Sequence, residues 1–194
     1  MTEKNRVVLI GRNGQVAWEL RNSAPKGVEL LCLGSKDINV FCHEELKGEI
    51  SSFKPTHIIN ASAYTAVDKA EKDIERAFAL NRDVVESLAQ IAKECASKII
   101  HISTDFVFNG EKSYSYSTDE LCDPINVYGE SKLAGENVLR EVYPENSVII
   151  RTSWVYSCHG NNFVKTMLRL LMEKTELNVV ADQIGCPTYA KGLA

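Results

Sequence analysis

Several features that mark other classes of protein are missing from this sequence of 194 residues. No apolar run approaches the ~20 residues that a helix needs to cross a bilayer, and the first five residues contain no apolar signal-peptide core. Basic residues are dispersed and the net charge is −4, which argues against a nucleic-acid partner. We therefore expect a cytoplasmic protein that binds neither membranes nor nucleic acid.

The six cysteines also lack the spacings of metal sites, since there is no C-x-x-C pair and no histidine at ligand distance along the chain. Reduced thiols are the expected state in a cytoplasmic protein. Internal repeats and low-complexity tracts are absent as well. With 44% hydrophobic residues, the chain suits one compact domain, or one domain plus part of another.

Short apolar, β-branched runs alternate with helical patterns, which is typical of βαβ units and a parallel sheet. Strands are expected at residues 7–10, 29–33, 57–61, 98–103 and 147–152. Helices are expected around residues 18–20 and at 43–53, 74–94, 130–142 and 162–174. We predict an α/β fold with a doubly wound parallel sheet, whose ligand binds beyond the carboxyl ends of the strands.

A turn with two glycines follows the first expected strand. Gly11 and Gly14 are expected to supply positive φ angles and to let the backbone approach a pyrophosphate at the N-terminus of the next helix. The third small position of the usual fingerprint is Ala17, so an ordinary strand-to-helix turn is the alternative. The turn predicts a dinucleotide site.

Tyr128 and Lys132 are four residues apart, which places them on one face of a helix. A nearby ammonium group favours the phenolate and should lower the tyrosine pKa toward the working range, so that the phenol can act as an acid. The spacing alone is a weak motif. Its position downstream of the glycine turn strengthens the interpretation.

Other short stretches with polar or aromatic side chains also follow expected strands, at residues 60–65, 103–105 and 151–156. The carboxyl ends of parallel strands share one edge of a sheet, so we expect these stretches to converge on one site. Plain alternatives remain open: Thr104 and Asp105 could cap the following segment, and Trp154 could belong to the core.

Seven blocks of the sequence resemble the extended short-chain dehydrogenases/reductases, and within them the dTDP-4-dehydrorhamnose reductases. The blocks span residues 14–20, 60–71, 103–108, 126–136, 151–156, 160–168 and 182–188. The resemblance implies a Rossmann-type NAD(P)-binding domain over residues 1–150. Residues 151–194 would then hold the end of the sheet domain and the start of a substrate-binding lobe. Members of the family continue beyond the last block, so this lobe is expected to be incomplete here.

The resemblance implies reduction of the C4 ketone of dTDP-6-deoxy-L-lyxo-4-hexulose to dTDP-L-rhamnose, for surface polysaccharide synthesis. Tyr128 would donate the proton, Lys132 would contact the nicotinamide ribose, and Thr104 would hydrogen-bond the substrate oxygen. Asp105, Trp154 and Asn162 would contact the sugar, with a helix N-cap as the alternative for Asn162. Besides Tyr128 and Lys132, the residues implied to contact the cofactor are Gly11, Arg12, Asn13, Gly14, Gln15, Val16, Asp37, Ile38, Ala61, Ser62, Ala63, Tyr64 and Thr65.

The segment after the second strand bears on the choice of cofactor. An acidic residue at that strand end normally binds the adenosine ribose of NAD, but here no carboxylate precedes Asp37. Ser35 and Lys36 could instead accept a 2′-phosphate, which favours NADPH and leaves NADH as the alternative. Some relatives bind Mg²⁺ through glutamates at a homodimer interface. Glu19 is a weak candidate for this role, because one carboxylate does not make a metal site.

Two other functions are consistent with the same motifs. One is a noncatalytic NADP-binding regulatory subunit that resembles the β subunit of methionine adenosyltransferase. The other is a different nucleotide-sugar reductase or an epimerase. The presence of Thr104, Tyr128 and Lys132 together favours the reductase.

Overall fold

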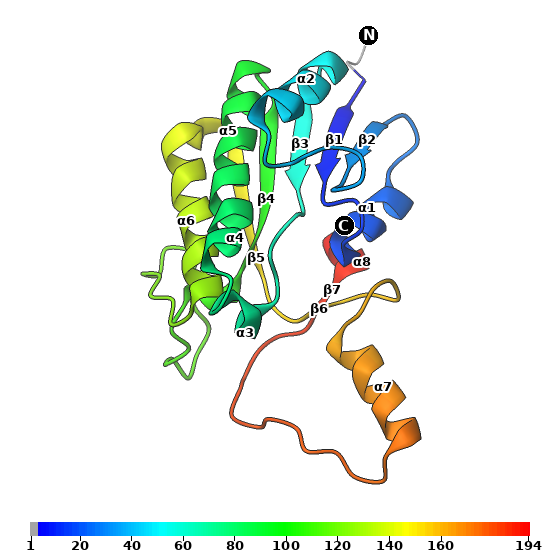
Figure 1. Cartoon of the computed structure of the whole chain (residues 1–194), viewed down its shortest axis with the longest axis vertical. Coiled ribbons are helices and arrows are strands. Elements are labelled where there is room, and N and C mark those ends of the chain that lie inside the picture. The colour runs from blue at the N-terminus through cyan, green and yellow to red at the C-terminus, as the bar shows by residue number, and fades with distance from the viewer. Residues whose placement is uncertain (1–3) are drawn as a thin grey trace.

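Five parallel strands form the centre of the computed structural model, which describes residues 4–194 (Figure 1). They are β1 (Arg6–Ile10), β2 (Glu29–Leu33), β3 (His57–Asn60), β4 (Lys98–Thr104) and β5 (Ser147–Thr152). Their order in the sheet is β2-β1-β3-β4-β5, and every neighbouring pair is parallel. The predicted parallel sheet is confirmed. The strand order reverses between β1 and β3, where open sheets of this kind bind ligands.

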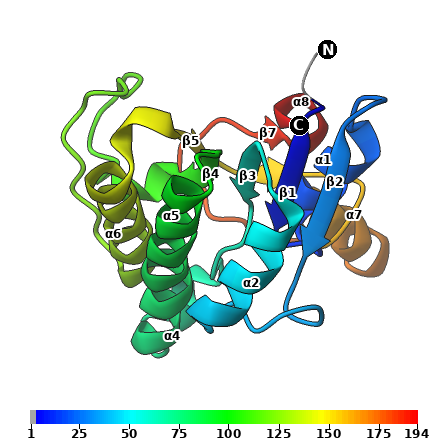
Figure 2. The ribbon, with the colours of Figure 1, turned by 90° about the horizontal axis from the view of Figure 1, so that it is seen from above.

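Helices cover both faces of this sheet (Figure 2). One face carries α2 (His43–Phe53), α5 (Val84–Glu94) and α6 (Val127–Val142), and the other carries α1 (Gln15–Ser23) and α8 (Ala190–Leu193). The shorter or peripheral elements are α3 (Val67–Ala70), α4 (Ile74–Phe78), β6 (Val155–Tyr156), α7 (Phe163–Glu173) and β7 (Thr188–Tyr189). The small strands β6 and β7 pair in parallel and form a separate two-stranded sheet.

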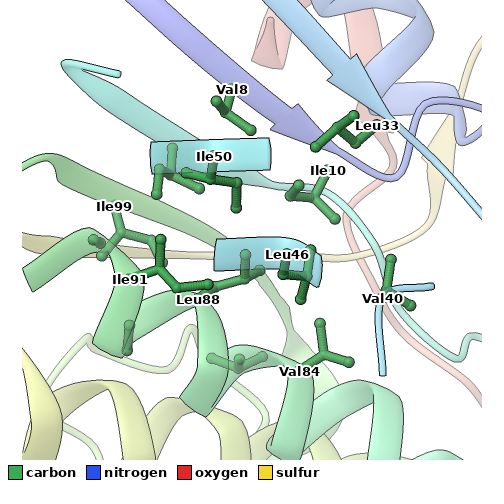
Figure 3. Close-up of a cluster of buried hydrophobic side chains, with 14 of the residues drawn as sticks. Val8, Ile10, Leu33, Val40, Leu46, Ile50, Val84, Leu88, Ile91 and Ile99 are labelled. Atoms are coloured by element: carbon green, nitrogen blue, oxygen red, sulfur yellow. The ribbon is translucent and has the colours of Figure 1, made fainter. Parts of the chain in front are cut away.

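The main core lies between the sheet and the α2/α5 face (Figure 3). Alternate residues of the strands point to this side, and the intervening ones point to α1 and α8. Both sides are covered at β1 and β3, which explains why these strands read as continuous apolar runs, whereas Val148 on the edge strand β5 is 53% exposed. The fully buried side chains of this cluster include Val8, Ile10, Ile58 and Ile99 from the strands and Leu46, Ile50, Leu88 and Ile91 from the helices.

Two predicted helices differ in detail from the observed ones. The helix expected over residues 74–94 is interrupted by a π-helical turn at Ala79–Asp83, between α4 and α5. The helix expected to begin at residue 130 begins at Val127, because the Asn126 side chain accepts a hydrogen bond from the backbone N–H of Gly129 at 2.8 Å. This start places Tyr128 within the first turn of α6.

The chain beyond β5 is packed differently. Apart from Ala190, it contributes no side chain to the buried apolar residues, and α7 has no buried residue. Within residues 4–194, no helix has the length and apolarity needed to span a membrane.

Candidate active site

The glycine turn comes close to the end of β3. Gly11 has a φ of +99°, and a Cβ added there would lie 2.7 Å from backbone atoms of Ala61 and Ser62. Only glycine permits both the conformation and the contact. Gly14 was expected to have a positive φ as well, and this was wrong: its φ is −72°, the extended N-cap conformation before α1. The turn therefore ends at the N-terminus of a helix that faces the strand-order reversal, which suits a phosphate group.

At the end of β2, Asp37 is engaged within the chain. One carboxylate oxygen accepts from the backbone N–H of Gly34 and the other from Arg12, each at 2.9 Å. The carboxylate thereby holds the half-exposed guanidinium of Arg12 beside the strand end. Ile38, which the family resemblance implied as a cofactor contact, lies 4% exposed in the main core. The guanidinium of Arg12 thus lies at the end of β2, where it forms an ion pair with the carboxylate of Asp37.

The stretch after β3 is fixed from the π-helical turn. Asn81 is buried on that turn, where its side chain accepts from the backbone N–H of Tyr64 at 2.8 Å and donates to the Tyr64 carbonyl at 3.2 Å. It also donates to the hydroxyl of Ser131 at 2.9 Å, on α6. One side chain thus links the predicted cofactor stretch 61–65 to the helix that carries Tyr128 and Lys132.

Two glycines let α6 approach its neighbours. A Cβ on Gly129 would lie 2.2 Å from the carbonyl oxygen of Phe106, and one on Gly135 would lie 2.1 Å from that of Asn81. Neither position accepts a larger residue without movement of the backbone. As a result, α6 packs closely against the turn that follows β4 and against the π-helical turn.

Tyr128 and Thr104 lie together at the carboxyl end of β4. Both are nearly buried, and Thr104 caps the short 3₁₀ turn Asp105–Val107 by accepting from the Phe106 N–H at 3.2 Å. The Thr104 hydroxyl also donates to the Asp105 carboxylate at 3.2 Å. The capping role considered for Thr104 is therefore present, and it holds the hydroxyl beside Tyr128.

The expected lowering of the Tyr128 pKa by Lys132 is not found. Burial raises the pKa of Tyr128 above its usual value, and the negative charge of Asp105 adds to this, while the Thr104 hydroxyl opposes it. Burial likewise raises the pKa of Asp105. In the chain without ligand, Tyr128 therefore keeps its proton, which is the form a proton donor requires.

The Lys132 side chain points into the protein rather than toward solvent. It is 1% exposed, and its Nζ donates to the carbonyl oxygen of Ile102 at 2.7 Å and lies 3.2 Å from Nε2 of His101. Burial lowers the pKa of Lys132 to about 8, against the opposing charge of Glu136. The prediction that Tyr128 and Lys132 share one face of a helix is met, one turn apart on α6.

Glu136 anchors the next turn of α6 to the sheet. Its buried carboxylate accepts from Ser103 at 2.5 Å and from Arg151 at 2.7 and 3.0 Å, and Arg140 adds a third donor at 2.8 Å. Burial alone would raise the pKa of Glu136, but these donors outweigh it and lower the pKa. These hydrogen bonds fix the position of α6 along its axis relative to β4 and β5.

Trp154 follows β5 and is not part of the core. Its side chain is 46% exposed, and its φ of +44° is rare for a bulky residue. The indole lies against the backbone of Gly185, where an added Cβ would be 2.9 Å from Cε2. A strained backbone that presents an exposed aromatic ring is typical of functional sites.

The segment 155–162 is tied to the glycine turn by polar contacts. Gln15 donates to the Val155 carbonyl at 3.2 Å and accepts from Asn162 at 2.9 Å. His159 lies 3.3 Å from the Asn13 carbonyl. Asn162 also donates to the Ser157 carbonyl and caps α7 by accepting from the Lys165 N–H at 3.0 Å. Both the nitrogen and the oxygen of the Asn162 amide are therefore hydrogen-bonded within the chain, which agrees with the N-cap alternative.

Glu19, on α1, also holds the segment 155–162 in place. Its carboxylate is 3% exposed and accepts from the Ser157 hydroxyl at 2.6 Å. Within residues 4–194, no group of three His, Cys, Asp or Glu side chains is arranged to hold a metal ion. The position of Glu19 is therefore explained by this contact, and it gives no support for a Mg²⁺ site within this chain.

The predicted stretches converge at the carboxyl edge of the sheet, at the ends of β1, β3, β4 and β5. Sequence reasoning included Asn60 in the stretch 60–65 but missed the other buried polar residues behind the site: Asn81, His101, Ser131 and Glu136. A signal for two of these exists. Asn81 falls on the apolar face of its helical pattern, and His101 interrupts an apolar strand. A polar residue at a core position requires partners.

Residues 5–194 match the family described as the RmlD substrate binding domain. A dTDP-4-dehydrorhamnose reductase of Sinorhizobium fredii is 47% identical over 189 residues, which cover 97% of this chain and 64% of the relative. The enzyme of the same name from Escherichia coli K12 is 45% identical, with the same coverage. A crystal structure of dTDP-4-dehydrorhamnose reductase from Bacillus anthracis in complex with NADP superposes with a TM-score of 0.95 at 38% identity, covering 98% of this chain and 68% of that one. The chain thus spans slightly less than two thirds of the length of these curated relatives.

Proposed function

The chain belongs to the RmlD substrate binding domain family, and from this premise we propose that it carries the cofactor-binding and proton-donating part of a dTDP-4-dehydrorhamnose reductase. The observation that carries the proposal is the placement of Thr104, Tyr128 and Lys132 at the carboxyl edge of the sheet, next to a glycine turn. The relatives of that name and the 47% identity support it.

The residues around the glycine turn fit a dinucleotide. Gly11 lets the turn lie directly against the backbone of Ala61 and Ser62, and the N-terminus of α1 that follows offers backbone N–H groups to a pyrophosphate. Arg12, held by Asp37, provides a cation for a 2′-phosphate in addition to Ser35 and Lys36, which supports NADPH as the cofactor. When bound, the nicotinamide supplies a hydride to the ketone carbon.

The protein supplies the proton for the ketone oxygen and the groups that orient it. Tyr128 holds a proton on its phenol at neutral pH, since its pKa is raised. As the ketone oxygen gains negative charge, the phenol donates to it, and the neighbouring Thr104 hydroxyl hydrogen-bonds the same oxygen. Lys132, one helical turn from Tyr128, would contact the ribose of the nicotinamide when the cofactor is bound. We expect Asp105 and Trp154 to contact the sugar of a dTDP-sugar substrate.

Replacement of Tyr128 tests this proposal. Tyr128→Phe keeps the packing but removes the proton, so NADPH consumption with dTDP-6-deoxy-L-lyxo-4-hexulose should fall by about 10²–10⁴-fold, the usual contribution of a general acid. NADPH binding, followed by its fluorescence, should stay within about twofold. Tyr114→Phe is the matched control, because Tyr114 is 68% exposed in the loop after β4. NADH run in parallel reports the cofactor preference.

The result separates the proposal from its alternatives. Turnover that is insensitive to Tyr128→Phe would contradict the assigned role. No turnover by the unmodified chain, with NADPH binding intact, would favour a cofactor-binding subunit of the regulatory kind. A nicotinamide that is recycled rather than consumed would indicate an epimerase.

A further inference from the structure

The indole of Trp154 occupies the space that a side chain at Gly185 would need. A Cβ added to Gly185 would lie 2.9 Å from Cε2, 3.0 Å from Cζ2 and 3.3 Å from Cδ2 of the indole. These three nearest atoms all belong to the ring, and none belongs to the backbone. Two carbon atoms in contact are ordinarily ~3.5–4.0 Å apart, so the added carbon would overlap the ring.

The backbone at Gly185 does not itself require glycine. Its φ lies outside the left-handed region, so an L-amino acid could adopt the same conformation. The residues on either side are Ile184, which is 100% exposed, and Cys186, which is also exposed, whereas Gly185 is partly covered. An otherwise exposed stretch therefore makes a close contact at a residue without a side chain, and the missing Cβ serves the indole rather than the backbone.

Hydrogen bonds hold the two segments together on both sides of this contact. The Ser153 hydroxyl donates to the Cys186 carbonyl at 2.5 Å, and the backbone N–H of Thr188 donates to the Trp154 carbonyl at 3.3 Å. The strands β6 and β7 pair directly afterwards, with Val155 opposite Thr188. These contacts also hold Trp154 at its rare φ of +44°. With both segments held, the position of the indole depends on what lies beneath it.

Resting on the proposed function, we propose that Gly185 is a positioning residue: its missing side chain lets the indole of Trp154 lie on the backbone and so sets the place from which the ring contacts the sugar of the substrate. The ring is 46% exposed, so part of it is free for a ligand. An indole offers a large apolar face at a small cost in conformational entropy, and the C–H groups of a hexose ring form a surface that fits it. A displaced ring would lose this contact. Gly185 would thus set the affinity for the sugar without touching it.

The position of the ring can be measured without a ligand. The chain has two tryptophans, so labelling with 5-fluorotryptophan gives one ¹⁹F resonance for Trp154 and one for Trp18, and Trp154→Phe identifies them. Gly185→Ala should move the Trp154 resonance and leave that of Trp18, which stacks on His159. Gly192→Ala is the matched control and should move neither, because nothing lies within 4 Å of a Cβ added there. An unmoved Trp154 resonance in Gly185→Ala would overturn the proposal.

Thermal unfolding separates movement of the ring from movement of the backbone. The atoms that the new methyl group of Gly185→Ala meets lie at the end of a half-exposed side chain, so the ring can give way while the fold is kept. The melting temperature should therefore stay within about 2 °C of that of the unmodified chain. A loss of more than about 5 °C would mean that the backbone moves instead, and would overturn the proposal.

Two ligands that differ only in the sugar test its contact with the ring. In Gly185→Ala, the Kd for dTDP-L-rhamnose should rise by about 3–10-fold, the range expected for the loss of one aromatic contact, while the Kd for dTDP stays within about twofold. In turnover, KM for the dTDP-sugar should rise by a similar factor and kcat should stay within about twofold, because the lost contact is made before and during the reaction alike. Equal losses for both ligands would mean that the ring contacts the nucleotide, and would overturn the proposal.

A double substitution tests whether Gly185 acts through the ring. Phenylalanine at position 154 is smaller and leaves room for a Cβ, so adding Gly185→Ala to Trp154→Phe should change the Kd for dTDP-L-rhamnose by less than about twofold. A further 3–10-fold loss in that background would overturn the proposal. If the unmodified chain neither reduces the dTDP-sugar nor binds dTDP-L-rhamnose, the proposed function fails, whereas the ¹⁹F resonances still decide on Gly185, so the two failures are distinguishable.

Discussion

Residues 6–152 and residues 153–194 are held in place by different forces. The first part packs apolar side chains on both faces of the sheet, and it inserts a small number of fully partnered polar groups into that packing. The second part buries almost no apolar side chain apart from Ala190 on α8, which packs against α1, and its segment 155–162 is attached through hydrogen bonds to the glycine turn and α1. Stability should therefore reside in the first part, while the second should respond to changes at a few polar contacts.

The largest expected effect on stability comes from adding a side chain at Gly135, where α6 packs closely against the π-helical turn in the first part. Gly135→Ala places a Cβ 2.1 Å from the Asn81 carbonyl oxygen, so the free energy of unfolding should fall by about 3 kcal/mol. Denaturant unfolding measures it. Gly48→Ala is the control, since Gly48 lies inside α2 with nothing within 4 Å, and it should gain about 0.5–1 kcal/mol. Equal effects at both positions would contradict the packing described for α6.

Loss of the buried carboxylate of Glu136 should come next. Glu136→Gln leaves Arg151 without its ion pair and should cost about 2 kcal/mol at pH 7. The pKa of Glu136 is lowered on folding, so its contribution is present above the unfolded pKa and is lost as pH falls through the folded one. The cost of the substitution should therefore shrink at pH below about 4. In the other region, Glu173→Gln breaks an exposed pair with Arg169 and should change stability by less than about 0.5 kcal/mol.

A smaller and local effect is expected where the two regions meet. Ser157→Ala removes the donor to the buried carboxylate of Glu19, so hydrogen exchange of residues 155–162 should accelerate by about tenfold while the strands keep their protection. Mass spectrometry of exchanged peptides resolves the difference. Ser52→Ala, at an exposed serine of α2, is the control. Faster exchange throughout the sheet would show that the regions unfold as one unit.

The smallest effect is expected on α7. Leu171 is 62% exposed, so Leu171→Ala should change the free energy of unfolding by less than about 0.5 kcal/mol. Thermal unfolding at low protein concentration provides the measurement. A loss above 1 kcal/mol would show that this helix packs against something in solution, and would remove the contrast between the two regions.

The elements with strong local signals were predicted closely. The strands at 29–33 and 147–152 and the helix at 43–53 agree with the observed bounds, because apolar periodicity and turn residues act over a few neighbours. The π-helical turn at 79–83 was not predicted. Its position depends on Asn81 reaching Tyr64 and Ser131, the latter 50 residues away. No periodicity within the helix contains that information.

The sequence by itself determined the parallel α/β fold, the edge of the sheet at which the candidate site residues gather, and the Tyr128–Lys132 spacing, since these follow from burial patterns and helix geometry over short distances. The tertiary structure alone decided the direction of the Tyr128 pKa shift, the partner of Lys132 and the role of Glu19. Charge states depend on which groups share a desolvated space. In this chain those groups come from β3, β4 and α6, and in the case of Glu19 from residues 138 positions apart, so only the folded packing brings them together.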